Sequence, residues 1–200
     1  MGAPVPAATT LLWLPLGAGA GGRFVRANGR VFEAVVARWE GRVPLDLYHS
    51  ALEVRLGEHR WVIEMTPVWS EGSPDRGVVG EGPVGVRPLG RSRWFRYEVR
   101  CWRDGVIPDA ATAVDSPRHL SADADRARRV LELVGAFPLA TWGRDEQRTG
   151  EMWNSNSLVS WLLARSGHDT DSLRPPAHGR APGWSAGLVV AARQAPARPA

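Results

Sequence analysis

The sequence contains no lysine and only one cysteine, Cys101. All 25 of its basic residues are therefore arginines, a bias that we attribute to GC-rich coding and from which we infer no function. A single cysteine excludes an intramolecular disulfide and a cysteine-based metal cluster. The net charge is only +4, so bulk charge does not favour a polyanionic partner. The chain also lacks an apolar run of about 18 residues, so no membrane-spanning helix is expected.

Motifs for metals, nucleotides and nucleic acids are also missing. The five histidines are scattered without the spacing of a zinc-binding motif, so no metal site is expected. The glycine-rich stretches 17–22 and 80–85 lack the spacing of a phosphate-binding loop, so no cofactor is expected. Arginine and aromatic residues interleave over 91–103, but Glu98 interrupts the basic face. This pattern favours a solvated, ion-paired sheet face over nucleic-acid binding.

The chain does contain enough apolar material for a folded domain. It has 200 residues, of which 44% are hydrophobic, and ten are tryptophans. We expect a single domain over 9–193, with flexible tails over 1–8 and 194–200. No positive charge precedes the short apolar run 10–16, which favours a first strand over a signal peptide and predicts a cytoplasmic location.

The hydrophobic pattern predicts strands in the middle of the chain, with helices before and after them. Alternating apolar residues predict a hairpin over 45–66, and 67–83 is interpreted as a long loop. Other strands are expected over 11–16, 84–89, 93–102 and 188–192, helices over 31–39, 121–133 and 156–166, a loop over 104–120 and a linker over 175–182. This order predicts an α+β domain with a mostly antiparallel sheet packed against helices.

The segment from Trp153 to Leu163 has the pattern of a helix start. Small polar residues, Asn154 to Ser157, lead into an apolar helical pattern and are typical of an N-cap. A side chain at this point lies at the positive end of the helix dipole, where enzymes place nucleophiles and hold oxyanions. Ser155 is therefore either a nucleophile or part of the cap alone, and both interpretations stay open at this point.

A serine nucleophile needs a base, and His49 is the candidate. His49 lies in a predicted strand on the face opposite the apolar stripe, so it either looks into a cleft or faces solvent. Glu64 in the next strand would orient His49 as a third group. The alternative for Glu64 is an ordinary carboxylate at the edge of the sheet. Asn154 would shape the turn or donate to the oxyanion.

Two short segments carry a resemblance to a known superfamily. An early "YHSALEV" strand and a late "WNSNSLVSWLL" helix start resemble, in that order, the circularly permuted branch of the papain-like (NlpC-type) superfamily. Lecithin–retinol acyltransferase-like proteins and the PPPDE peptidases belong to that branch. There a strand histidine comes first, and a nucleophilic cysteine comes late in an Asn-Cys pair that opens a helix. His49 matches the histidine and Asn154 the asparagine, but Ser155 stands in place of the cysteine.

A second resemblance covers nearly the whole chain. "NSNS" is similar to the "PNSNTF" of uncharacterised bacterial proteins. The segments "DLYHSALEVRL", "GVIPD", "WNSNSLVSWLL" and "APGWSAGLVVAAR" resemble a family of uncharacterised actinobacterial proteins, which brings no known activity.

The superfamily resemblance implies a papain-like domain and two functions of different classes. The first is a hydrolase or acyltransferase that acts on an amide or ester through Ser155 and His49, with helix N–H groups around Asn156 at the oxyanion. The second is a catalytically inactive papain-like domain that binds a ligand or a protein partner. Because serine is a weaker nucleophile than cysteine, the substitution leaves both functions open.

Overall fold

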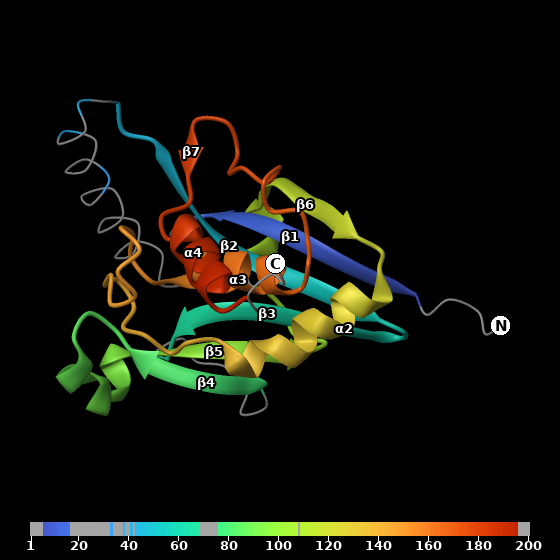
Figure 1. Cartoon of the computed structure of the whole chain (residues 1–200), viewed down its shortest axis with the longest axis horizontal. Helices are drawn as coiled ribbons and strands as arrows, with labels where there is room; N and C mark the ends of the chain where they lie inside the picture. Colours follow the sequence, from blue (N-terminus) through green and yellow to red (C-terminus); the bar gives the residue numbers. More distant parts are fainter. Residues whose placement is uncertain are drawn as a thin grey trace, which may run out of the picture.

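The computed structural model describes residues 6–16, 33, 38, 41, 43–68, 76–107 and 109–195. An open sheet with strand order β4-β5-β3-β2-β1-β6 forms its centre, and β7 pairs with β2 (Figure 1). The strands are β1 (Ala7–Pro15), β2 (Asp46–Leu56), β3 (His59–Pro67), β4 (Val78–Pro83), β5 (Arg96–Arg103), β6 (Val114–Ser121) and β7 (Gly179–Arg180). Every pairing except that of β7 with β2 is antiparallel, which confirms the expected α+β class and mostly antiparallel sheet.

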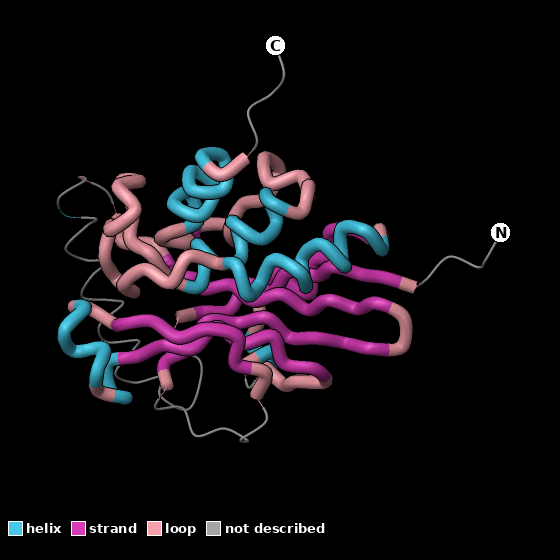
Figure 2. The backbone as a smooth tube through the Cα atoms, turned by 60° about the horizontal axis from the view of Figure 1, so that its bottom comes forward, coloured by secondary structure: helices cyan, strands magenta, loops and turns pink. Residues whose placement is uncertain are grey.

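Three α-helices accompany the sheet. They are α2 (Ala124–Leu133), α3 (Ser155–Arg165) and α4 (Trp184–Arg193). Short 3-10 helices connect the larger elements: η1 (Arg87–Arg91), η2 (Arg93–Phe95), η3 (Ala110–Thr112) and η4 (Val134–Ala136). Helices α2 and α3 pack on one face of the sheet, and α4 packs on α3 (Figure 2). The sheet thus has a face covered by helices and a second face turned away from them.

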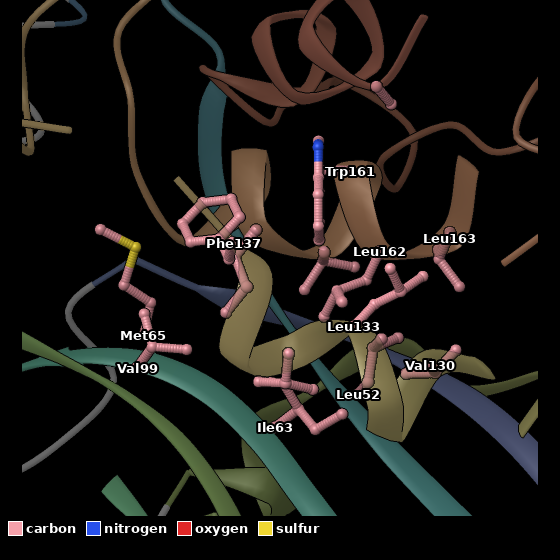
Figure 3. Packing of buried hydrophobic residues seen from close by; sticks show 14 of the residues in the cluster. Leu52, Ile63, Met65, Val99, Val130, Leu133, Phe137, Trp161, Leu162 and Leu163 are labelled. Carbon is pink, nitrogen blue, oxygen red and sulfur yellow. The ribbon is translucent and has the colours of Figure 1, made fainter. Parts of the chain in front are cut away.

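Apolar side chains separate into two groups according to the face of the sheet. The larger group lies between the sheet and the helices and includes Leu52, Ile63, Val130 and Leu162 (Figure 3). The smaller group lies on the second face and comprises Leu12, Leu14, Ala51, Val62 and Ile107. Because successive strand residues point to opposite faces, this separation assigns each strand side chain to one face or the other.

The hairpin predicted over 45–66 is confirmed as β2 and β3. Its two strands join at Gly57, which has a φ of 64°, a conformation that glycine adopts without strain. The pairing of β2 with β3 runs from Leu56 opposite His59 to Leu52 opposite Ile63, and these two strands form no further pair toward the start of β2. On its edge toward β3, the first half of β2 therefore presents backbone groups that need other partners.

The predicted last strand over 188–192 is wrong, because this segment belongs to α4. A short apolar run does not distinguish a buried strand from a buried helix. Gly187 explains why the helix fits: a Cβ at this position would lie 2.1 Å from Ser160 Oγ in α3. The glycine lets α4 pack directly against α3.

The predictions for 67–102 are wrong in their element boundaries. The expected loop 67–83 contains β4. No strand forms over 84–89, where Val84 makes only an isolated bridge and 87–89 belong to η1. The expected strand 93–102 begins only at Arg96, after η2. Pro88 lacks an N–H and favours the first turn of a helix, which is the position it has in η1.

Three other boundaries also differ from the sequence predictions. The expected loop 104–120 contains β6, and the expected linker 175–182 contains β7. Helix α2 begins after Asp123, whose side chain accepts hydrogen bonds from the N–H groups of Asp125 and Arg126, so the cap is not at Ser121. The predicted helix over 31–39 lies largely outside the described residues.

Candidate functional site

The candidate nucleophile, Ser155, is the first residue of α3, and Asn154 is the N-cap before it. The Asn154 side-chain oxygen accepts from the N–H groups of Asn156 at 2.9 Å and Ser157 at 3.4 Å. The Ser157 hydroxyl in turn accepts from the N–H of Asn154, which completes a capping box. These N–H groups are the donors expected at an oxyanion, and they are already engaged by Asn154.

Asn156 joins α3 to the first half of β2, which pairs with β1 but not with β3. Its side-chain nitrogen donates to the Tyr48 carbonyl at 3.0 Å, and its oxygen accepts from the Ser50 hydroxyl at 2.8 Å. Asn156 is 2% exposed, so these hydrogen bonds satisfy polar groups that water does not reach. Because Tyr48 and Ser50 flank His49, this contact brings the start of α3 beside the strand segment that carries the candidate base.

The same helix start is also tied to the beginning of α4. The side-chain nitrogens of Asn154 and Asn156 donate to the Pro182 carbonyl at 2.8 and 2.9 Å. The Ser157 hydroxyl donates to the Gly183 carbonyl at 2.8 Å, and the Ser160 hydroxyl donates to the Trp184 carbonyl at 2.7 Å. The polar residues of the motif therefore form a joint between β2, α3 and α4.

Ser155 has no part in this joint. Its side chain is 3% exposed, and its hydroxyl forms no hydrogen bond within the described residues. A serine hydroxyl becomes a nucleophile only when a base is within hydrogen-bond reach. The structure therefore leaves Ser155 unengaged but does not activate it.

His49 lies on the second face of the sheet. Its cross-strand partner Leu14 and its neighbour Ala51 belong to the apolar group of that face, whereas Ser50 and Tyr48 point toward α3. Burial lowers the pKa of His49 to about 4, so the imidazole is neutral at neutral pH. No hydrogen bond joins His49 to Ser155 or Glu64 within the described residues. The two segments are neighbours, but the two side chains are not paired.

Glu64 belongs to a buried charge network on the second face. Its carboxylate accepts from Arg100 at 3.2 Å, and Arg100 also donates to Glu98 at 2.9 Å. Arg76 binds Glu98 through two nitrogens, at 3.0 and 2.7 Å. Burial raises the pKa of Glu64, although Arg100 opposes this shift. Burial also opposes ionisation of Glu98, but its hydrogen bonds from Arg76 and Arg100 hold the pKa below its usual range. The partner of Glu64 is thus Arg100 and not His49.

A separate surface feature lies at one end of the sheet, in residues 86–96, which we call the exposed lobe. It contains η1 and η2 and extends beyond the end of β4 (Figures 1 and 2). Four large apolar side chains on it are exposed to solvent: Val86 (39%), Leu89 (44%), Trp94 (59%) and Phe95 (42%). Clusters of this kind on a surface mark interaction sites more often than isolated apolar residues do.

An open hollow of about 440 Å³ adjoins the exposed lobe. Val86 and Arg87 line it from the lobe, and Thr141, Arg144 and Glu146 line it from the loop after η4. Glu146 binds Arg87 at 2.9 Å and also the Thr141 hydroxyl, so the loop is fixed to the lobe. The Arg87 hydrogen bond is the main reason that the pKa of Glu146 is lowered to about 2.

Sequence reasoning missed the exposed lobe because it assigned Phe95 to the buried stripe of a strand. The signal available in the sequence is Pro88 and Gly90, because both residue types interrupt strands and argue against a continuous strand here. Within the described residues, no group of three or more side chains is arranged to hold a metal ion. No helix in the described part of the chain is long and apolar enough to cross a membrane.

Comparison with protein-family models, with curated proteins and with solved structures finds no significant match.

Proposed function

We propose that this chain is a non-catalytic domain of papain-like arrangement that binds a partner through the exposed lobe. The observation that carries the proposal is the cluster of four exposed apolar side chains, led by Trp94 at 59% exposure. The start of α3 supports the non-catalytic part of the proposal, because its polar groups form hydrogen bonds to other elements and Ser155 is only 3% exposed. A buried serine without a base beside it, next to an N-cap supplied by Asn154, is consistent with a domain that lacks the chemistry.

The papain-like part of the proposal rests on the order and packing of two segments. A histidine-bearing strand comes early, and a helix that opens with an asparagine comes late and packs against that strand. Asn156 donates to the Tyr48 carbonyl and accepts from the Ser50 hydroxyl, and these contacts on either side of His49 support the likeness. The serine at position 155 and the Glu64–Arg100 ion pair are departures that favour loss of the chemistry.

A second candidate function is hydrolysis of, or acyl transfer from, an amide or ester through Ser155 and His49. The specific observation in its favour is that His49 lies in the strand segment that α3 contacts, between Tyr48 and Ser50. This function requires the Ser155 hydroxyl and the imidazole to approach within hydrogen-bond distance, around the unpaired edge of β2. Reaction of Ser155 with a fluorophosphonate probe distinguishes the two functions.

The binding function is tested with an anionic apolar dye, anilinonaphthalene sulfonate. We expect the native protein to bind the dye and the variant Leu89→Ser/Trp94→Ser to lose most of the fluorescence, with unchanged circular dichroism. The matched control is Val106→Ser, which removes an apolar side chain that is 63% exposed outside the lobe. The proposal would be overturned if Val106→Ser removed dye binding while Leu89→Ser/Trp94→Ser left it intact. It would also be overturned if the native protein did not bind the dye.

A further inference from the structure

We infer that the exposed lobe docks on an anionic lipid surface, with its apolar side chains in the bilayer interface and its arginines at the headgroups. This inference rests on the proposed binding function and names the partner of the same surface. It is carried by the charge of the lobe, the kind of apolar residue that it exposes, and its shape.

The charge of the lobe is positive and only partly compensated. Residues 84–97 contain four arginines and no acidic residue. Two of these arginines form ion pairs with neighbouring strands or loops, Arg87 with Glu146 and Arg96 with Glu81. Arg91 and Arg93 are exposed and have no acidic partner within the described residues. Two exposed arginines without an acidic partner in the described part of the chain therefore lie in the same segment as the exposed apolar residues.

The apolar residues of the lobe suit the boundary between headgroups and acyl chains. Trp94 is an amphipathic aromatic residue of the kind that gathers at membrane interfaces. The Arg93 guanidinium lies 5.4 Å from the centre of the Trp94 ring, so the cation and the ring are presented together. Leu89 and Phe95 add apolar surface that can enter the outer acyl region while the arginines stay at the headgroups.

The shape of the lobe favours a lipid surface over a nucleic acid. Proteins that bind single strands present a basic groove with aromatic rings on which bases stack. The lobe instead projects from the end of the sheet in both views (Figures 1 and 2). Two of its four exposed apolar residues, Val86 and Leu89, are aliphatic and offer no ring for stacking. A projection with aliphatic and aromatic residues fits insertion into a soft interface.

The test measures co-sedimentation of the full chain with phosphatidylcholine vesicles, with and without phosphatidylglycerol. We expect binding only to the anionic vesicles. Charge reversal by Arg91→Glu/Arg93→Glu should weaken it by at least about tenfold. The matched control, Arg128→Glu/Arg129→Glu, makes the same charge change on exposed residues of α2 and should retain binding. Brominated lipids should quench the native protein more than Trp94→Phe. Circular dichroism establishes that each variant is folded.

The outcomes separate this inference from the proposed function. No vesicle binding, equal loss in both charge-reversal variants, or quenching that Trp94→Phe leaves unchanged would overturn the lipid partner. Binding of a single-stranded DNA oligonucleotide that depends on Trp94, without vesicle binding, would assign the lobe to nucleic acid instead. Retained dye binding with no vesicle binding overturns only the lipid partner, whereas loss of both overturns the binding function as well.

Discussion

At the scale of single residues, the Asn-Ser motif at the start of α3 divides into residues that hold the fold and one that does not. Asn154, Asn156 and Ser157 each bond to groups from other elements or to the helix itself. Ser155 alone contributes no hydrogen bond within the described residues. The residue that the sequence singles out for chemistry is therefore the one with the smallest structural role.

This division predicts different stabilities for two neighbouring substitutions. Asn156→Ala should lower the free energy of unfolding by about 2–4 kcal/mol, because it leaves buried partners such as the Ser50 hydroxyl and the Tyr48 carbonyl unpaired. Ser155→Ala should change it by less than about 1 kcal/mol. Urea denaturation of the two variants beside the native protein measures both values. A Ser155→Ala loss as large as that of Asn156→Ala would mean that the serine hydroxyl has a partner in solution.

Sequence reasoning predicted a cap in the polar run 154–157, with Asn154 and Ser155 as its candidates; the structure confirms Asn154, but the second residue of the capping box is Ser157. The role of Asn156 was not predicted. A cap is a local signal, because small polar residues bond to N–H groups two or three residues away. Asn156 instead contacts Tyr48, which lies 108 residues earlier in the chain. Nothing in the local pattern indicates such a partner, so only the folded chain reveals it.

At the scale of elements, the contact of α4 with α3 depends on close approach at Gly187. A Cβ added there would lie 2.1 Å from Ser160 Oγ and 2.2 Å from the Ser157 carbonyl oxygen. The second of these atoms is backbone and does not move easily. The glycine also explains why an apolar segment that suits a strand by composition forms a helix here. Without a side chain at Gly187, the helix packs closely against Ser157 and Ser160 of α3.

Gly187→Ala should therefore destabilise the protein by about 2–4 kcal/mol, because overpacking forces the two helices apart. The control is Gly135→Ala in η4, where an added Cβ meets no atom within 4 Å. That substitution should be neutral or slightly stabilising, since alanine has less freedom to lose on folding. Thermal melts of both variants measure the difference. Equal melting temperatures would show that α4 does not pack on α3 as described.

The element boundaries around the exposed lobe illustrate a different limit of sequence reasoning. Phe95 alternates in phase with Tyr97 and Val99, so the pattern extends the strand backward to include it. In the structure Tyr97 and Val99 are fully buried, whereas Phe95 is 42% exposed. Where an apolar residue is kept at the surface, periodicity alone misplaces it.

At the scale of the whole molecule, the fold buries titratable groups either as ion pairs or as neutral histidines. The second face holds the ion-paired network of Glu98 and Arg100, in which each charge has an opposite charge beside it. The helical side holds His168, which is 7% exposed and sits after the end of α3. Its Nδ1 lies 2.8 Å from the Ser166 hydroxyl oxygen, and its Nε2 has no partner within the described residues.

The buried His168 predicts a stability that falls with acidification. Burial lowers the pKa of His168 from 6.5 to about 4. Arg126 adds a smaller effect in the same direction, whereas Asp123 opposes it. As the pH falls through this window the unfolded state binds the proton first, so the free energy of unfolding decreases. The loss approaches about 3 kcal/mol for this group, and His49 changes stability in the same direction.

The check is the free energy of unfolding as a function of pH for the native protein and for His168→Gln. Removing the imidazole should reduce the decrease between neutral pH and pH 4, while the contribution of His49 remains. An unchanged pH profile would show that His168 is accessible to protons in the folded state.

The central claim is that the start of α3 is a structural joint and not an active serine. Reaction of the native protein with a fluorophosphonate probe, read by intact mass beside Ser155→Ala and His49→Ala, tests it most directly. A serine hydrolase treated in parallel establishes that the probe is active. We predict no adduct on the native protein. An adduct that is located at Ser155 and is lost in both folded variants would contradict the claim and establish the Ser155–His49 pair as catalytic.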